Sequence, residues 1–152
     1  MIKKILKKIG KNSIISQKEI ASAAHEKRNA VLKLSSEIIS KNTNKIIEAN
    51  KEDLLLANKA GLKESYIDRL LLDSKRISAI SESLISISTL PDPLSGKITK
   101  WERPNGLIIS KQPTPLGVLG IIYESRPNVT VDAAALCIKS GNSVILRCGS
   151  DS

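Results

Sequence analysis

The feature that most constrains the fold is a strand–helix–strand pattern in the last third of the chain. Gly117–Tyr123 is a short apolar run, suited to a strand that is buried on both faces. Thr130–Ser140 has the composition of an apolar helix, with Asn128 or Thr130 near its cap, and Ser143–Arg147 is a second β-rich run. The pattern predicts a parallel βαβ unit, and therefore an α/β fold class.

The first ninety residues have the spacing of helices. A capping-box pattern at Ser16–Glu19 precedes apolar residues at helical intervals and predicts the start of a helix. A second helix is predicted from about Thr43 to Ala60, where Gly61 would end it. A short helix around Tyr66–Leu71 and a longer one capped by Asp73 complete this region.

The helical spacing of apolar residues ends at two closely spaced prolines, Pro91 and Pro93, because each disfavours a helical conformation of the preceding residue. Ile98–Arg103 and Leu107–Lys111 then flank Asn105-Gly106, which predicts a β-hairpin with a type I′ turn. We therefore divide the chain into a helical region at 1–90, a linker and hairpin at 91–114, and the start of an incomplete βαβ domain at 115–152.

Composition narrows the class of protein. Only 2% of the residues are aromatic, so the core must consist of Ile, Leu, Val and Ala. The net charge of +9 admits a nucleic-acid binder, but the lysines are spread among acids with no aromatic stripe or zinc-type spacing. We favour a solvated basic surface, with no nucleic-acid partner and no metal.

Ile2, Ile5 and Leu6 could touch a membrane surface, although docking of this N-terminal segment on the domain, or fraying, is the simpler interpretation. We expect a cytoplasmic protein with no membrane partner.

Two polar loops follow the two predicted strands, at residues 123–128 and 147–150. The carboxyl ends of parallel strands lie at one edge of a sheet, where ligands bind beside helix N-termini. Each loop carries an arginine and small hydroxyl residues, which suit a phosphate-bearing ligand. The alternative is that Arg126 and Arg147 only pair with local acids such as Glu124 and Asp151. No Walker or GxGxxG motif decides between the two.

The run Tyr123-Glu-Ser-Arg-Pro-Asn128 is a highly specific motif. Further motifs lie in order along nearly the whole chain: Ala49–Leu54, Gly61-Leu62, Asp68–Leu70, Leu90–Pro93, Trp101, Pro104–Leu107, the rest of Pro115–Thr130, Leu136–Asn142 and Val144–Arg147. Together these motifs resemble those of γ-glutamyl phosphate reductases, also called glutamate-5-semialdehyde dehydrogenases, in the aldehyde dehydrogenase superfamily.

The resemblance implies a step of proline biosynthesis, in which γ-glutamyl phosphate is reduced by NADPH to glutamate 5-semialdehyde with release of phosphate. In the family a cysteine in a later catalytic domain forms a thioester, and nothing in this sequence matches its surroundings. Cys137 lies in an apolar helix and is expected to be core, while Cys148 stands where the family usually has glycine and could hinder the cofactor. His25 has no motif around it and is expected on the surface or in helix packing.

The resemblance also implies site residues, although none of them is catalytic. The expected substrate-binding residues, for phosphate or the oxyanion, are Arg126 and Asn128. The expected NADP(H)-binding residues are Tyr123, Glu124 and Ser125 on the nicotinamide side, and Arg147, Gly149 and Ser150 on the adenosine side.

We therefore expect an N-terminal fragment of this oxidoreductase that is inactive alone. The hairpin would help to join subunits, in a homo-oligomer or in a complex with a separate C-terminal half. The alternative is a non-catalytic binding or assembly module that complements such a half. A charge-driven nucleic-acid or membrane binder ranks last.

Overall fold

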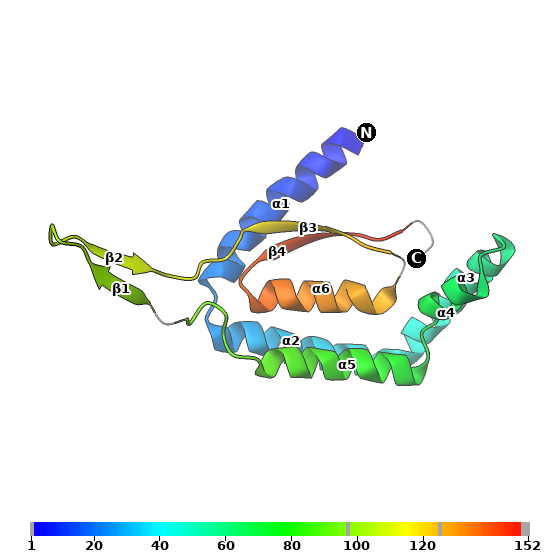
Figure 1. Ribbon diagram of the computed structural model, residues 1–152. Coiled ribbons are helices and arrows are strands. Elements are labelled where there is room, and N and C mark those ends of the chain that lie inside the picture. Colours follow the sequence, from blue (N-terminus) through cyan, green and yellow to red (C-terminus); the bar gives the residue numbers. More distant parts are fainter. Residues whose placement is uncertain (1, 97, 125, 150–152) are drawn as a thin grey trace.

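The computed structural model describes residues 2–96, 98–124 and 126–149. Figure 1 shows the helices and strands in chain order. They are α1 (Ile2–Ser22), α2 (His25–Lys41), α3 (Thr43–Lys59), α4 (Glu64–Leu70), α5 (Ser74–Thr89), β1 (Thr99–Glu102), β2 (Ile108–Lys111), β3 (Val118–Ile122), α6 (Pro127–Lys139) and β4 (Ser143–Arg147).

The parallel pair β3 and β4 lies beside α6, and α6 in turn packs on α5 and α2 (Figure 1). The buried side chains that join these three helices are Leu32, Leu84, Ile87 and Ala135, each 8% exposed or less. This core is aliphatic, as the composition predicts. The α/β class and the helix–hairpin–βαβ order are also confirmed.

The predicted helix start at Ser16 is wrong, because α1 runs without a break from Ile2 to Ser22. A capping box needs backbone amides that lack a partner, and inside a helix the amides after Ser16 already bond to carbonyls of the preceding turn. The break comes instead at Ala23 and Ala24, before α2. Helix α1 contacts β4 and β3, while the apolar side chains at its start are exposed.

The predicted helix capped by Asp73 is confirmed: its carboxylate accepts the backbone N–H of Arg76 at 2.7 Å, in the first turn of α5. Gly61 follows α3 with φ +68°, a left-handed conformation that suits a residue without Cβ. The predicted helices at 43–60 and 66–71 correspond to α3 and α4, with small shifts of their ends.

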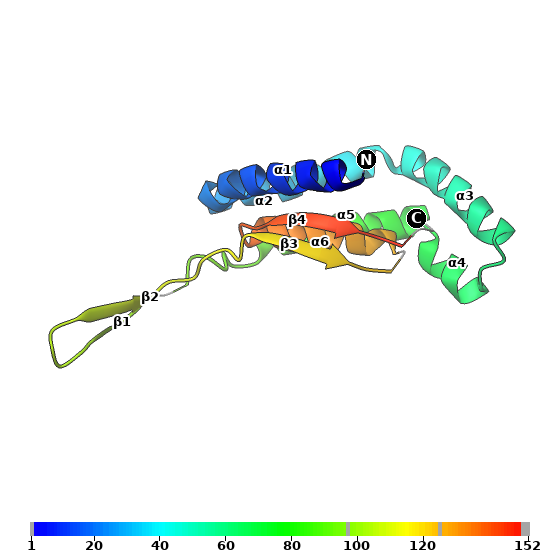
Figure 2. The ribbon, with the colours of Figure 1, turned by 90° about the horizontal axis from the view of Figure 1, so that it is seen from above.

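The hairpin forms as predicted, with β1 and β2 antiparallel, and projects away from the rest of the chain (Figures 1 and 2). Its turn is not type I′, because Gly106 has φ +79° but no described residue other than glycine has positive φ. Pro104 favours a negative φ at the first central position, and the N–H of Gly106 donates to the carbonyl of Arg103 at 2.9 Å. The loop is therefore a type I-like turn followed by a left-handed glycine.

The βαβ unit has the predicted strands, but α6 begins at Pro127 rather than near Thr130. Proline suits the first helical position because its missing N–H has no helical acceptor there, so Arg126 becomes the N-cap residue. Strand β3 is not buried on both faces: its residues alternate, and Ile122 is 85% exposed. The faces of a strand are covered by the elements that pack on them, and among the described residues the helices α1 and α6 contact β4 more than β3.

A buried polar cluster ties the far end of α6 to α2. Arg28 donates from Nη1 to the carbonyl of Lys139 at 3.0 Å, and from Nη2 to both carboxylate oxygens of Asp92 at 2.9 and 3.0 Å. Lys139 donates from Nζ to Asn29 Oδ1 at 2.7 Å and to the carbonyl of Ser88 at 2.9 Å. This cluster fixes the direction of α6, and thereby the place of its N-terminus.

Candidate active site at the carboxyl edge of the parallel strands

The two polar loops lie at the same edge of the sheet. Ile122 pairs with Arg147 in the parallel register, and the N–H of Tyr123 donates to the carbonyl of Arg147 at 3.1 Å. Residues 123–124 and 147–149 therefore leave the sheet side by side. Ser125 and Ser150 lie outside the described residues, so their predicted roles stay predictions.

Tyr123 and Cys148 line a mainly apolar hollow of about 570 Å³ between α3, α5 and α6. The hydroxyl of Tyr123 bonds to Thr130 Oγ1 at 2.6 Å, which holds the ring against the first turns of α6. The half-buried ring of Tyr123 gives the hollow an aromatic wall, and β4 ends beside Tyr123 at the exposed cation Arg147. Such a surface suits a flat ring that carries charged groups at one end.

Glu124 stands between two arginines. Its Oε2 lies 3.2 Å from Arg69 Nη1 and 3.7 Å from Arg126 Nε. The local pairing that the sequence offered as an alternative thus occurs for Arg126, whereas Asp151 lies outside the described residues. All three side chains are between 45% and 62% exposed, so solvent weakens these ion pairs and a ligand can compete for them.

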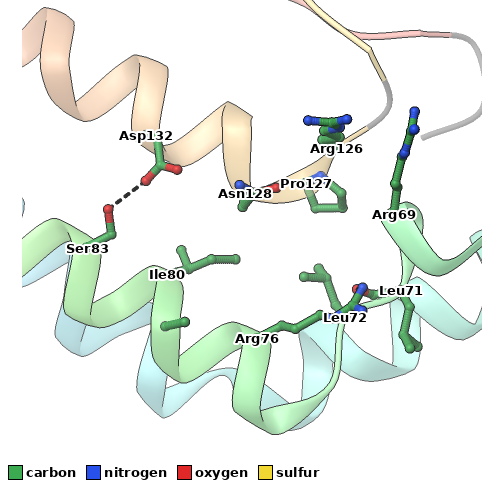
Figure 3. Close-up of a pocket in the computed structure, with 11 residues that line it drawn as sticks. Arg69, Leu71, Leu72, Arg76, Ile80, Ser83, Arg126, Pro127, Asn128 and Asp132 are labelled. Carbon is green, nitrogen blue, oxygen red and sulfur yellow. Dashed lines mark hydrogen bonds between the residues drawn. The ribbon is translucent and has the colours of Figure 1, made fainter. Parts of the chain in front are cut away.

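A second cavity, of about 450 Å³, opens beside this triad between α4, α5 and α6 (Figure 3). Arg126 and Asn128 both line it, at the N-terminal end of α6. Its other polar lining residues are Arg69, Arg76, Ser83 and Asp132, and its apolar lining residues are Leu71, Leu72, Ala79, Ile80 and Pro127.

Three of these polar side chains, those of Ser83, Asp132 and Arg76, are held by neighbours. Ser83 Oγ donates to Asp132 Oδ1 at 2.8 Å, across the gap between α5 and α6 (Figure 3). Arg76 bonds to the backbone carbonyl and the carboxylate of Asp68 and, at 3.1 Å, to the carbonyl of Leu71, so its guanidinium braces the loop between α4 and α5.

Sequence reasoning missed Arg69, Arg76, Ser83 and Asp132 as site residues. The only signal in the sequence is the Asp68–Leu70 motif of the resemblance, which includes Arg69 but implies no function for its side chain. The contacts that bring these residues into the cavity join distant parts of the sequence. Arg69 contacts Glu124 across 55 positions, and Ser83 contacts Asp132 across 49 positions.

None of the described residues that line this cavity is a cysteine. Cys137 is 4% exposed within the core, and burial raises the pKa of its thiol. No group of three or more His, Cys, Asp or Glu residues suited to a metal ion occurs among the described residues. None of the helices in that same part of the chain combines the length and the apolarity that crossing a membrane requires.

Curated relatives of this chain are gamma-glutamyl phosphate reductases. A gamma-glutamyl phosphate reductase from Brucella suis biovar 1 is 47% identical over 151 residues, 99% of this chain and 36% of that protein. One from Thermoanaerobacter sp. (strain X514) is 55% identical over 124 residues, 82% of this chain and 30% of that protein. This chain is similar to part of γ-glutamyl phosphate reductase.

Solved structures of γ-glutamyl phosphate reductase have the same fold. The enzyme from Thermotoga maritima aligns with a TM-score of 0.88 at 39% identity, over 93% of this chain and 34% of that one. The Saccharomyces cerevisiae enzyme gives 0.87 at 34% identity, over 95% and 37%. A benzaldehyde dehydrogenase from Corynebacterium glutamicum, at 20% identity and a TM-score of 0.67, supports the aldehyde dehydrogenase fold alone. No family model matches the chain.

The chain spans about a third of the length of the curated γ-glutamyl phosphate reductases that it matches. It corresponds to an N-terminal portion of the aldehyde dehydrogenase fold. The resemblance inferred from the motifs is thus confirmed, and the alternative of a separate assembly module is not favoured.

Proposed function

We propose that this chain forms the cofactor- and substrate-binding edge of an NADP(H)-dependent γ-glutamyl phosphate reductase. The reaction is the reduction of γ-glutamyl phosphate to glutamate 5-semialdehyde and phosphate in proline biosynthesis, in the cytoplasm. The observation that carries the proposal is the meeting of the 123–124 and 147–149 loops at one sheet edge, in a chain 47–55% identical to reductases of that name.

The residues present fit the cofactor. Arg147 is an exposed cation at the end of β4, suited to the additional phosphate of NADP. Tyr123, Glu124 and Ser125 would border the nicotinamide, while Arg147, Gly149 and Ser150 would border the adenosine. When bound, NADPH supplies the hydride. The side chain of Cys148, at a position usually held by glycine in the family, would narrow the space on the adenosine side.

Arg126 and Asn128 would hold the substrate. Both lie at the N-terminal end of α6, where the backbone amides and the helix dipole favour negative charge. The guanidinium can donate two parallel hydrogen bonds to a phosphate, and the amide can donate to a developing oxyanion.

We propose that neither described cysteine is the nucleophile, since the thiol of Cys137 is buried with a raised pKa, and Cys148 would border the adenosine side of the cofactor, away from the nicotinamide. The thiol would come from sequence outside these 152 residues, so the polypeptide by itself would show no turnover. The three regions 1–90, 91–114 and 115–152 would be a helical region, an oligomerisation hairpin and the start of the NADP-binding domain. The hairpin would join copies in a homo-oligomer or dock a separate C-terminal half.

The test is cofactor binding by the purified chain, measured by calorimetry with NADPH and NADH. We expect NADPH to bind more tightly, and Arg147→Gln to remove about tenfold or more of that preference, because a charge-assisted bond contributes roughly 1.5–3 kcal/mol. Lys100→Gln in the exposed β1 removes the same charge far from the edge and should change nothing. Equal binding of the two cofactors, or an effect of Lys100→Gln as large as that of Arg147→Gln, would refute the proposed edge.

A further inference from the structure

Tyr123 is held at its backbone and at its ring. Its backbone N–H donates to the carbonyl of Arg147 at 3.1 Å, which fixes the residue at the edge of the sheet. Its hydroxyl bonds to Thr130 Oγ1 at 2.6 Å, at the start of α6, the helix that follows β3 in the chain (Figure 1). The place of the ring therefore depends on a residue seven positions further along the chain.

The hydroxyl of Thr130 orients another side chain. A hydroxyl inside a helix commonly bonds back to a carbonyl of the preceding turn, as those of Ser88 and Thr89 do in α5. The bond between Thr130 and Tyr123 instead leaves the helix and reaches the residue that follows β3. It joins the first turns of α6 to the end of the strand.

The ring that Thr130 holds is part of the hollow between α3, α5 and α6. Tyr123 is half-buried there, and Ile80 and Val131 are among the apolar residues that line the same hollow. Under the proposed function this is the nicotinamide side of the edge, while Arg147 lies on the adenosine side. A planar heteroaromatic ring packs well on an aromatic face, and it binds more tightly when that face is already held in one orientation.

We propose that Thr130 is a positioning residue for the cofactor. Its hydroxyl holds the ring of Tyr123 in the orientation that receives the nicotinamide, and Thr130 acts through that ring. The inference rests on the proposed function and deepens it, because it divides the site into two halves that can be perturbed separately. Arg147 acts on the adenosine half, whereas the pair of Tyr123 and Thr130 acts on the nicotinamide half.

The test compares NADPH with adenosine 2′,5′-bisphosphate, which lacks the nicotinamide, in calorimetric titrations of the purified chain. Thr130→Val removes the hydroxyl at nearly constant volume, and we expect it to weaken NADPH binding about two- to tenfold, the range for one net hydrogen bond. Binding of the bisphosphate should stay the same. Thr130→Ser keeps the hydroxyl and should keep most of the affinity for NADPH.

Tyr123→Phe should have the same effect as Thr130→Val. The double variant should bind NADPH no more weakly than either single variant, because the two changes remove the same bond. The chain has only two tyrosines, so the ring signals of Tyr123 in a tyrosine-labelled sample are assigned by their loss in Tyr123→Phe. NADPH should shift these signals in the unmodified chain, and the bisphosphate should not.

Thr89→Val is the matched control. Thr89 is an exposed helical threonine whose hydroxyl bond of 2.7 Å lies at the end of α5, away from the hollow. Its replacement should change the binding of neither probe. Urea denaturation of every variant separates an effect on binding from an effect on stability.

Several results would overturn the inference: an unchanged affinity for NADPH in folded Thr130→Val, an equal loss for the two probes, additive effects of the two changes, or equal shifts of the Tyr123 signals by both probes. If Arg147-dependent binding of both probes accompanies any of these results, the proposed function stands. A Thr130 effect confined to NADPH, with no contribution from Arg147, would support the positioning role and count against the proposed edge. No measurable binding of NADPH to the unmodified chain would overturn both.

Discussion

Replacing Arg28 by methionine should be one of the most destabilising single changes in the chain. The side chain is 4% exposed, and its substitution breaks two bonds to Asp92 and one to the carbonyl of Lys139. Removing one partner of a buried ion pair costs about 3–5 kcal/mol. Arg28 Nε, however, is buried and has no acceptor among the described residues, so its removal returns about 1 kcal/mol. The net loss in the free energy of unfolding is therefore about 3 kcal/mol.

The assay is urea denaturation followed by far-ultraviolet circular dichroism, with Arg28→Met, Asp92→Asn and the double variant forming a cycle. Asp92→Asn keeps an oxygen that can accept the N–H of Leu94, which Asp92 Oδ1 now accepts at 3.0 Å. We expect a coupling energy of about 1–3 kcal/mol between the two positions, because the second change removes a group that the first has already left unpaired.

The matched control is Lys51→Met. Lys51 Nζ lies 3.0 Å from Glu48 Oε2, about the same N–O distance as in the buried pair, but the side chains are 62% and 74% exposed. Solvent screens such a pair, so its loss should cost less than about 1 kcal/mol. If Arg28→Met and Lys51→Met lower the stability equally, or if the coupling energy is near zero, burial does not govern the contribution of the cluster and the argument fails.

Three further outcomes are expected. Gly141→Ala should lower the midpoint of thermal denaturation, because φ is +74° and a Cβ would lie 2.9 Å from Leu94 Cδ1, whereas Gly10→Ala in α1, with no atom within 4 Å, should raise stability by about 0.5–1 kcal/mol. Asp73→Ala should cost about 1 kcal/mol by loss of the α5 cap, seen as a lower urea midpoint; no change would contradict that role. Burial lowers the pKa of Lys139, so between the lowered and the ordinary value the unfolded chain binds more protons than the folded chain, and stability should rise with pH there. Lys139→Met should flatten this rise in urea titrations at successive pH values.

The elements predicted correctly depend on short-range chemistry. A carboxylate three positions before a backbone amide caps α5 whatever the rest of the fold does, and an apolar β-rich run bounded by polar residues defines β4. Two of the errors, the start of α6 and the type of the hairpin turn, have local causes of the same kind. Pro127 and Pro104 each fix a backbone angle more strongly than the neighbouring Asn or Thr side chains bias it.

The burial of β3 could not be predicted in this way, because burial depends on neighbours rather than on the strand's own sequence. An apolar run such as Val118–Ile122 indicates a strand suited to cover on both faces. Among the described residues, however, the helices α1 and α6 contact β4 more than β3, so the side chains of β3 alternate between exposed and half-buried. The strand assignment is therefore correct, and only the expected burial of Val118 and Ile122 is wrong.

The same reasoning explains why only half of the cavity was predictable. Arg126 and Asn128 follow a strand directly, so the rule for parallel sheets places them at a ligand-binding edge. Asp132 carries no such signal, because a carboxylate in the second turn of an apolar helix is usually a solvated residue. Its place in the cavity follows only from its bond to Ser83, 49 positions away along the chain. The pairing of α5 with α6 is what converts two unremarkable helical residues into a charged wall opposite the arginines. A site built from helix packing is therefore visible only once the helices have been docked, whereas a site built from strand ends can be found in the sequence.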